Sequence, residues 1–175
     1  MVPPMRLVEL DSFSAQQEAA IEGDEPAPWG GGAAETLSWS SKQRYVAALD
    51  GDGQPVGVIG ALVVEVEVGD AARFPVVGLG GLIVTAALRG RGVGGRLIER
   101  MLEIAAAIGP QRAMLFCAPE LVRRYERYGF RPIEDAVFAE QPSGRVEMPV
   151  EAMWRGLRED AGWPAGRVDV LGLPF

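Results

Sequence analysis

A short turn rich in arginine and glycine is the part of the sequence best suited to chemistry. Residues 89–95 read Arg-Gly-Arg-Gly-Val-Gly-Gly; they follow an apolar run that ends at Val84 and precede an amphipathic helix expected from about Val93 to Ile108. A strand, a glycine turn and a helix start aim unpaired backbone N–H groups and the positive end of the helix dipole at one place. Such a place binds phosphate groups, so the sequence predicts a phosphate site here.

Two common phosphate-binding motifs fit the turn poorly. A P-loop requires a lysine and a serine or threonine after its last glycine, whereas arginine and leucine follow Gly95. Gly90, Gly92 and Gly95 have the G-x-G-x-x-G spacing of dinucleotide-binding folds, but five residues separate Gly90 from the end of the apolar run at Val84. In a dinucleotide fold the first glycine follows the strand almost directly. Both motifs are therefore disfavoured.

The arginine spacing matches a third pattern. Arg89-x-x-Gly92-x-Gly94 resembles the pyrophosphate loop of the GNAT superfamily, the acetyl-CoA-dependent N-acetyltransferases. Residues 124–130, Arg-Tyr-Glu-Arg-Tyr-Gly-Phe, resemble the family's aromatic–Tyr–x–x–x–Gly–Phe segment, and a short apolar strand separates the two motifs. The resemblance covers about residues 43–150. It implies an α+β (mixed α/β) fold, in which a mostly antiparallel sheet is splayed at its two central strands and flanked by helices.

The resemblance also implies how acetyl-CoA is bound. Backbone N–H groups of residues 91–95 would hold the pyrophosphate, because glycines let the backbone approach closely, and Arg89 or Arg91 would add positive charge. The strand at residues 82–84 would pair with the pantetheine arm and polarise the thioester carbonyl. The implied cofactor-binding residues are Leu82, Ile83, Val84, Arg89, Gly90, Arg91, Gly92, Val93, Gly94 and Gly95. Without the resemblance, the arginines fit a solvated turn and the strand fits ordinary core.

A tyrosine is the candidate general acid, because the sequence contains no histidine. Tyr125 stands where the family places a tyrosine that protonates the leaving thiolate. An unperturbed tyrosine has a pKa of about 10, so it is protonated at pH 7 and can donate. The alternative role is a core aromatic at the end of a helix. That role fits Tyr128 better, because Tyr128 directly precedes Gly129 and Phe130.

The general base is left open by the sequence. Many family members place a glutamate on the strand before the loop, but residues 78–81 read Gly-Leu-Gly-Gly and would instead leave space for an acceptor beside the thioester. Other carboxylates are candidates for the base, although each is equally an ordinary surface acid: Asp24, Glu25, Glu35, Asp169 and the carboxylate of Phe175. The acceptor-side candidates are Glu35, Gly80, Gly81, Asp169 and Phe175.

The C-terminal segment carries a second, weaker resemblance. Residues 163–170, Trp-Pro-Ala-Gly-Arg-Val-Asp-Val, are followed by a short aromatic C-terminus and resemble the aminoglycoside 2′-N-acetyltransferase branch of the family. In that branch an acid near the C-terminus and the terminal carboxylate reach the acceptor site. The resemblance implies that role for Asp169 and Phe175. The acidic N-terminal loop would suit a polycationic acceptor.

Cys117, the only cysteine, ends the predicted strand that follows the helix. A ping-pong reaction through an acyl-cysteine is one interpretation, and a small buried hydrophobe is the other. A single cysteine excludes an internal disulfide. Without histidine, no metal site is expected.

Composition narrows the class of protein. The chain has 175 residues, a net charge of −7 and an isoelectric point near 4.7, which disfavours nucleic acid as a partner and suits a cationic small molecule. No apolar run approaches the roughly 20 residues that cross a membrane, and the N-terminus lacks the apolar region of a signal peptide. We therefore expect a cytoplasmic protein without a membrane partner. The family resemblance makes a homodimer the expected assembly.

The elements around these motifs alternate in a strand-first order. The sequence predicts strands at Met5–Leu10, Gln43–Leu49, Val56–Val68, Val76–Val84, Arg112–Cys117, 132–138 and 145–150, and helices at Ser14–Glu22, Val93–Ile108 and 119–128. We expect one domain over residues 1–175, with an irregular acceptor-side loop at residues 23–41 and a tail at residues 151–175.

The sequence thus predicts an N-acetyltransferase. It would transfer an acetyl group from acetyl-CoA to a primary amine of a small molecule by direct attack, with Tyr125 as general acid. The alternative is a non-catalytic acyl-CoA-binding or regulatory module on the same fold, because a fold does not determine a function.

Overall fold

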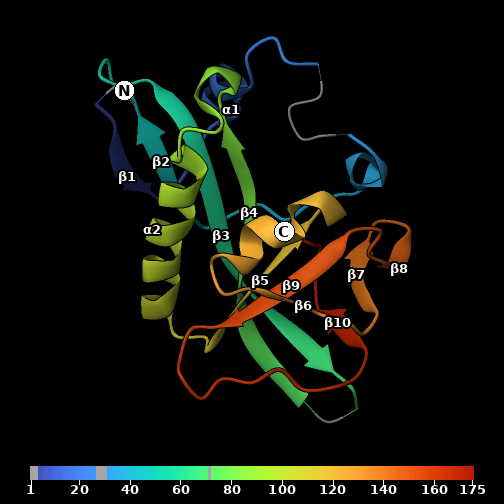
Figure 1. Ribbon diagram of the computed structural model, residues 1–175. Helices are drawn as coiled ribbons and strands as arrows, with labels where there is room; N and C mark the ends of the chain where they lie inside the picture. The colour runs from blue at the N-terminus through green and yellow to red at the C-terminus, as the bar shows by residue number, and fades with distance from the viewer. Residues whose placement is uncertain (1–3, 27–30, 71) are drawn as a thin grey trace.

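The computed structural model describes residues 4–26, 31–70 and 72–175. Within these ranges ten strands form one curled sheet, in the order β6-β9-β5-β4-β3-β10-β7-β8, with β2 added to β3 and β1 to β2 (Figure 1). The strands are β1 (Arg6–Leu10), β2 (Arg44–Leu49), β3 (Pro55–Val68), β4 (Ala72–Val84), β5 (Arg112–Cys117), β6 (Arg131–Pro132), β7 (Val137–Gln141), β8 (Gly144–Glu147), β9 (Glu151–Gly156) and β10 (Val168–Val170). The helices are α1 (Ala15–Glu22), α2 (Val93–Ile108) and α3 (Val122–Glu126), with 3₁₀ turns at Ala33–Thr36, Ala86–Leu88 and Pro119–Leu121. The predicted mixed α/β class is confirmed.

The long antiparallel hairpin of β3 and β4 forms the centre of the sheet. Residues 57–62 of β3 are buried on both faces, because helices cover both sides of the sheet there. Farther along β3 the side chains alternate: Val66 and Val68 are buried, and Glu65 and Glu67 form exposed ion pairs with Arg73 of β4.

β4 and β5 run side by side for only a short distance. Val77–Leu79 pair in parallel with Ala113–Leu115, and no later pairing joins the two strands within the described residues. The register between β3 and β4 shifts opposite Gly81, whose φ of 63° is a conformation that glycine adopts without strain. An irregularity of this kind bends a strand. The two central strands therefore separate, as the resemblance predicted.

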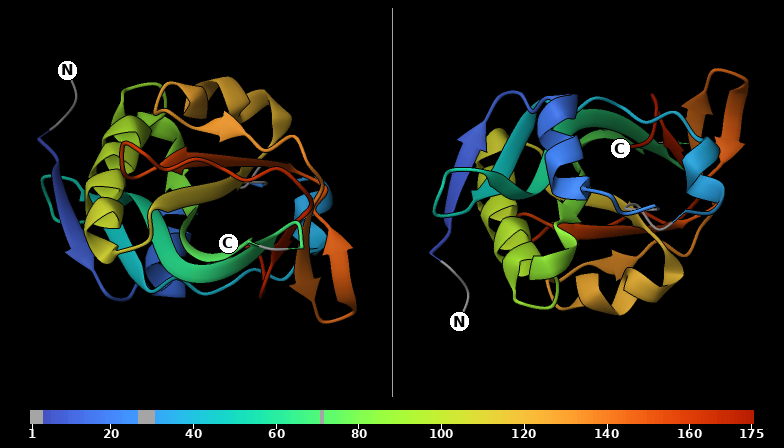
Figure 2. Two further views of the ribbon diagram at one scale, coloured as in Figure 1. Left: turned by 90° about the horizontal axis from the view of Figure 1, so that it is seen from below. Right: turned by 90° about the horizontal axis from the view of Figure 1, so that it is seen from above.

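Helices α1 and α2 cover opposite faces of the same part of the sheet (Figure 2). The apolar side of α2 packs Leu97 into the main core, whereas α1 buries Ile21 against Ile83 on the other face. The first turn of α1 is closed by a capping box, in which the side chains of Ser14 and Gln17 accept hydrogen bonds from each other's backbone N–H groups. Because Leu97 of α2 and Val84 of β4 share the main core, the start of α2 is held against the end of β4.

The helix predicted over residues 119–128 is shorter than expected. A 3₁₀ turn at Pro119–Leu121 precedes α3, and a further turn leads to Gly129, whose φ is 81°. The prediction of one continuous helix was wrong because i→i+3 hydrogen bonds tighten the chain at both ends, as from the Tyr128 N–H to the Tyr125 carbonyl. The tightening leaves α3 only five residues long.

The C-terminal part is more regular than the sequence suggested. The strands expected at 132–138 and 145–150 are replaced by β6, β7 and β8 at shifted positions. The segment expected to be a tail, residues 151–175, contributes β9 beside β5 and β10 between β3 and β7. Because these partners lie far away in the sequence, a local pattern could not reveal the pairing.

Candidate active site

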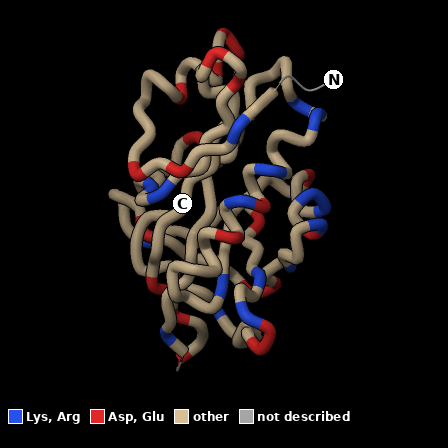
Figure 3. The backbone as a smooth tube through the Cα atoms, turned by 90° about the vertical axis from the view of Figure 1, so that its left-hand side faces the viewer, with Lys and Arg blue, Asp and Glu red and all other residues tan. Residues whose placement is uncertain are grey.

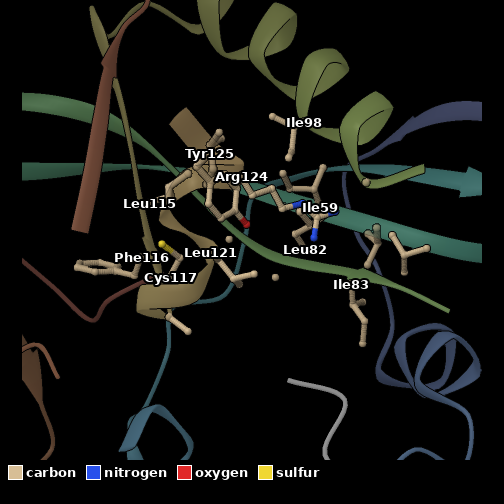
Figure 4. Close-up of a pocket in the computed structure, with 18 of the residues that line it drawn as sticks. Ile59, Leu82, Ile83, Ile98, Leu115, Phe116, Cys117, Leu121, Arg124 and Tyr125 are labelled. Carbon is tan, nitrogen blue, oxygen red and sulfur yellow. The ribbon is translucent and has the colours of Figure 1, made fainter. Parts of the chain in front are cut away.

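A cleft of about 1750 Å³ opens where β4 and β5 separate. Figure 4 shows Arg124 and Tyr125 projecting into it from α3, with Leu82 on the β4 side and Cys117 on the β5 side. The predicted cofactor-binding residues line this cleft with the exception of Arg91, which is exposed. We call residues 82–95 together with Arg124, Tyr125 and Tyr128 the cofactor half of the cleft.

The N-terminus of α2 presents uncapped backbone donors to the cofactor half. The first helical hydrogen bond runs from the Arg96 N–H to the Gly92 carbonyl, so the N–H groups of Val93–Gly95 have no partner within the helix. The N-cap is Gly92, with φ of 85°, and no side chain bonds these donors. A helix start without a side-chain cap leaves its amides to an anionic ligand.

Two side chains of the α3 segment lie against the glycines of this helix start. A Cβ on Gly94 would lie 2.6 Å from a guanidinium nitrogen of Arg124, and a Cβ on Gly95 would lie 2.5 Å from the hydroxyl of Tyr128. The absence of a side chain at both glycines therefore lets Arg124 and Tyr128 lie directly against the helix start. Arg124 was not expected from the sequence to be a site residue. Tyr128 packs against the main core, as expected, and its hydroxyl also lies at this helix start. The spacing of four between the two residues places them on one side of the helical segment.

Arg89 forms hydrogen bonds with other residues of the chain. Its guanidinium forms two hydrogen bonds of 2.6 Å with the carboxylate of Glu25, and its Nε donates to the Val84 carbonyl at 2.9 Å. The hydrogen bond from Arg89 lowers the pKa of Glu25. Glu25 is thus an ionised partner of the loop, which makes it a poor candidate for the general base.

Tyr125 is held between the core and the cleft. Its ring packs edge-on against Phe130 at 6.2 Å between centroids, and its hydroxyl faces the cleft near Cys117 (Figure 4). Burial, with a smaller contribution from Cys117, raises the pKa of Tyr125 to about 12. The phenol is therefore protonated throughout the neutral pH range.

Cys117 has the surroundings of a structural residue. It is buried, with 7% of its surface exposed, and its sulfur lies 3.8 Å from the sulfur of Met153. Burial and the nearby Glu151 and Glu120 raise the pKa of the Cys117 thiol to about 11. A protonated thiol is a weak nucleophile, which disfavours the acyl-cysteine interpretation.

The space expected beside the strand glycines is occupied by the chain itself. A Cβ on Gly78 or on Gly80 would lie 2.6 Å from Phe175, whose ring covers the first glycine and whose carbonyl carbon lies against the second. The expectation that these two glycines leave room for an acceptor is therefore wrong. Gly81 alone has open space around its Cα, and Phe175 forms a wall of the cleft.

Lys42 crosses the sheet next to this wall and was missed by the sequence analysis. Its side chain lies over the facing pair Gly60 and Gly80, where any Cβ would collide with it or crowd it, at 2.4 Å and 3.1 Å. Its Nζ donates to the Ser40 carbonyl at 3.0 Å. One feature of the sequence could have drawn attention to Lys42: it is the only lysine, whereas the other sixteen basic residues are arginines.

Aromatic side chains complete this side of the cleft. Trp39, which is 37% exposed, lies edge-on to Phe116 at 6.3 Å, and Phe116 lies 5.1 Å from Phe175. The N–H of Ser40 donates to the Pro174 carbonyl at 2.7 Å, which ties this segment to the C-terminal residues. We call the following set the acceptor half of the cleft: Glu18, Glu35, Trp39, Lys42, Phe116 and Phe175.

The remaining acceptor-side candidates are divided by the structure. Glu35 lines the cleft from an exposed 3₁₀ turn. Asp24 and Asp169 do not line it. Partial burial alone would raise the pKa of Asp169, but hydrogen bonds from Arg145 and Arg167 hold it below its usual value. Among the described residues no group of three potential ligands that could hold a metal ion is found.

Comparison with known proteins identifies the family. Residues 13–130 match the model of the acetyltransferase (GNAT) family. The chain belongs to this family. The match includes the α2 loop and Tyr125, so the resemblance predicted from the two motifs is confirmed, and the protein is an acetyltransferase of the GNAT type.

Relatives and solved structures agree with this assignment. Over 49 residues this GNAT chain is 45% identical to a "Probable glucosamine 6-phosphate N-acetyltransferase 2" and 41% identical to a "Glucosamine 6-phosphate N-acetyltransferase 1", both from Oryza sativa subsp. japonica. These matches span 28% of this chain and only 30% of each relative. The structure of the GNAT protein YhbS from Escherichia coli in complex with CoA matches with a TM-score of 0.64 and 19% identity, covering 99% of this chain and 98% of YhbS. A GNAT acetyltransferase from Brucella melitensis in complex with acetyl-CoA matches with a TM-score of 0.57 and 21% identity, covering 94% of each chain.

Two further observations concern the placement of charged residues and the character of the helices. In the view of Figure 3, acidic and basic positions are interspersed along the backbone. None of the described helices is both long and apolar enough to cross a membrane.

Proposed function

We propose that this GNAT protein transfers the acetyl group of acetyl-CoA to a primary amine of a small molecule. The observation that carries the proposal is the arrangement of the cleft: the free N–H groups of Val93–Gly95 and the hydroxyl of Tyr125 border one space, along the part of β4 that β5 does not pair. The bound CoA and acetyl-CoA of the two similar structures support acetyl-CoA as the cosubstrate.

The cofactor half would bind acetyl-CoA largely through backbone groups. The amides of Val93–Gly95 and the dipole of α2 would hold the pyrophosphate, with the guanidinium of Arg124 beside them. The groups of residues 80–84 that face β5 lack a strand partner and are open to the amide groups of the pantetheine arm. One N–H of this strand would then donate to the thioester carbonyl oxygen.

The chemical step would be direct attack on the thioester. The neutral amine nitrogen forms a bond to the carbonyl carbon, and the negative charge that develops on the carbonyl oxygen is stabilised by the β4 N–H. The carbon–sulfur bond then breaks, and the leaving thiolate takes the proton of the Tyr125 hydroxyl. The proton lost by the amine passes to water. Because the thiol of Cys117 is protonated, no acyl-enzyme intermediate is invoked.

The experiment combines binding with turnover. Calorimetric titration measures the affinity for acetyl-CoA, and release of free CoA measures transfer to a panel of amines. Tight binding with amine-dependent CoA release is expected. Binding without transfer to any amine would favour a non-catalytic acyl-CoA-binding module, and the absence of binding would contradict both functions.

A further inference from the structure

Lys42 is a cation in the acceptor half that forms no close ion pair with the described residues, although the charge of Glu18 acts on it. Its Nζ gives one of its three N–H donors to the Ser40 carbonyl, and none of the described residues forms an ion pair with it. Burial of an ammonium group without a directly paired counter-charge is unfavourable. Such groups persist where a ligand supplies the missing charge, and the position of Lys42 in the substrate cleft makes that ligand the acceptor.

The backbone around Lys42 is shaped to hold this side chain. Two glycines that face each other across β3 and β4, Gly60 and Gly80, leave the channel in which its methylene groups lie. The channel fixes the ammonium group at the end of a chain that would otherwise rotate freely. Gly80 also adjoins Gly81, where β4 bends away from β5 and the thioester is expected. The cation is therefore positioned beside the proposed reaction centre.

The charges nearby favour a carboxylate over a phosphate as the missing anion. Glu18 contributes a negative charge that acts on Lys42, and Glu35 lines the same half of the cleft. A phosphate dianion would meet one lysine and two carboxylates, whereas binding sites for phosphate ordinarily supply several cations or helix amides. A carboxylate carries one charge and matches the two remaining donors of Lys42. Glu18 provides an opposite charge for the ammonium form of the amine.

The aromatic wall indicates the rest of the acceptor. Trp39, which is exposed, and Phe116, which is half-buried, line the same half of the cleft as Lys42, and the buried ring of Phe175 packs behind Phe116. Exposed aromatic surface in a substrate cleft binds apolar groups. From these observations we infer that the acceptor is an amine that also carries a carboxylate and an aromatic or apolar side group, with Lys42 binding the carboxylate. The inference rests on the proposed function.

Matched probes test the inference. Phenylalanine and phenethylamine differ only in the carboxylate, and glucosamine 6-phosphate and glucosamine differ only in the phosphate. Wild-type protein should acetylate phenylalanine with kcat/KM about 10- to 100-fold above phenethylamine, the value of one charge-assisted hydrogen-bonded contact. The variant Lys42→Met should lose that preference, because its kcat/KM for phenylalanine falls more than its kcat/KM for phenethylamine, and its affinity for acetyl-CoA should not change. Arg44→Gln, which removes an exposed positive charge outside the cleft, should behave as wild type.

A second readout does not depend on turnover. Because Lys42 is the only lysine, the rate at which an amine-acylating reagent modifies it can be followed by mass spectrometry of one peptide. In the presence of CoA, phenylalanine should slow this modification more than phenethylamine does. Equal protection by the two probes, a phenethylamine preference, or a loss of both activities in Lys42→Met would overturn the inference. A preference for glucosamine 6-phosphate that Lys42→Met abolishes would overturn the carboxylate assignment. Loss of acetyl-CoA binding by the wild type would instead contradict the proposed function.

Discussion

The two halves of the cleft are built in different ways. The cofactor half takes most of its groups from one continuous segment, residues 82–95, and most of these groups are backbone amides. The acceptor half takes side chains from α1, from the segment before β2, from β5 and from Phe175 at the end of the sequence. A backbone site needs local geometry, whereas a side-chain site needs the whole fold to bring its members together.

This difference matches what each half is proposed to recognise. A GNAT acetyltransferase meets the same cosubstrate whatever its acceptor, and the family model, which spans residues 13–130, includes all of the cofactor half. Phe175 lies outside that match. The other members of the acceptor half lie within the match, so Phe175 alone closes this half from outside the matched residues.

The largest effect is expected at the boundary of the two halves. Tyr125→Phe should lower kcat about 100-fold or more, because general acid catalysis contributes that much, and should leave the affinity for acetyl-CoA unchanged. Steady-state kinetics and calorimetric titration measure the two quantities. Since the pKa of Tyr125 is raised to about 12, wild-type activity should show no loss from tyrosine ionisation below about pH 10. A variant with wild-type kcat would remove Tyr125 from the mechanism.

Arg124 tests the cofactor half alone. Arg124→Gln should weaken acetyl-CoA binding by about tenfold or more, because a charge-assisted contact with phosphate is lost, without changing the choice of acceptor. The dependence of the affinity on salt should also decrease. Arg158→Gln provides the control, since it removes an exposed arginine that does not line the cleft. Equal affinities in the two variants would show that the guanidinium beside Gly94 does not bind the cosubstrate.

A substitution of Lys42 in the acceptor half should change the stability of the fold. Lys42→Met should raise the free energy of unfolding by about 1 kcal/mol at pH 7, because an apolar chain of similar length replaces a half-buried charge without an ion pair. Burial lowers the pKa of Lys42, so the cost of the charge is fully present below the folded-state pKa. It disappears as the pH rises toward the unfolded-state value of about 10.4.

Denaturant unfolding at pH 7 and pH 10 should accordingly show a gain that shrinks with pH. A destabilised Lys42→Met variant would mean that Lys42 serves the fold instead of the acceptor.

A smaller effect is expected where the N-terminal segment meets the loop. Glu25→Gln should tighten acetyl-CoA binding by about two- to fivefold, because release of Arg89 from an exposed ion pair makes its charge available to the phosphates. Asp24→Gln is a matched control, as it removes a neighbouring charge outside the cleft. Weaker binding in Glu25→Gln would indicate that the ion pair positions Arg89 for the cosubstrate.

The smallest effect is expected at Cys117. Cys117→Ala should retain the wild-type kcat and lose only about 1 kcal/mol of stability, as expected for a small buried hydrophobe. The thiol should react slowly with iodoacetamide at pH 8, since its pKa is raised to about 11. An acetylated cysteine peptide after mixing with acetyl-CoA would contradict direct attack and support a ping-pong reaction.

The sequence by itself pointed to residues 82–95 and Tyr125 of the cofactor half, but not to Arg124 or Tyr128. Turn, helix start and glycine spacing are local, because a glycine at positive φ and a run of free amides depend on residues within one turn of each other. For the same reason the order of strand, loop and helix can be predicted from the sequence. Arg89-x-x-Gly92-x-Gly94 and the Tyr125 segment were enough to identify the GNAT family.

Only the tertiary structure decided the acceptor half. Phe175 fills the space that Gly78 and Gly80 appear to offer in the sequence, and Lys42 lies across a channel made by glycines of two strands. Asp169, a candidate from its place near the C-terminus, pairs with arginines outside the cleft. These positions follow from strand pairing between distant segments, which is governed by burial over the whole sheet and leaves no trace in the spacing of neighbouring residues.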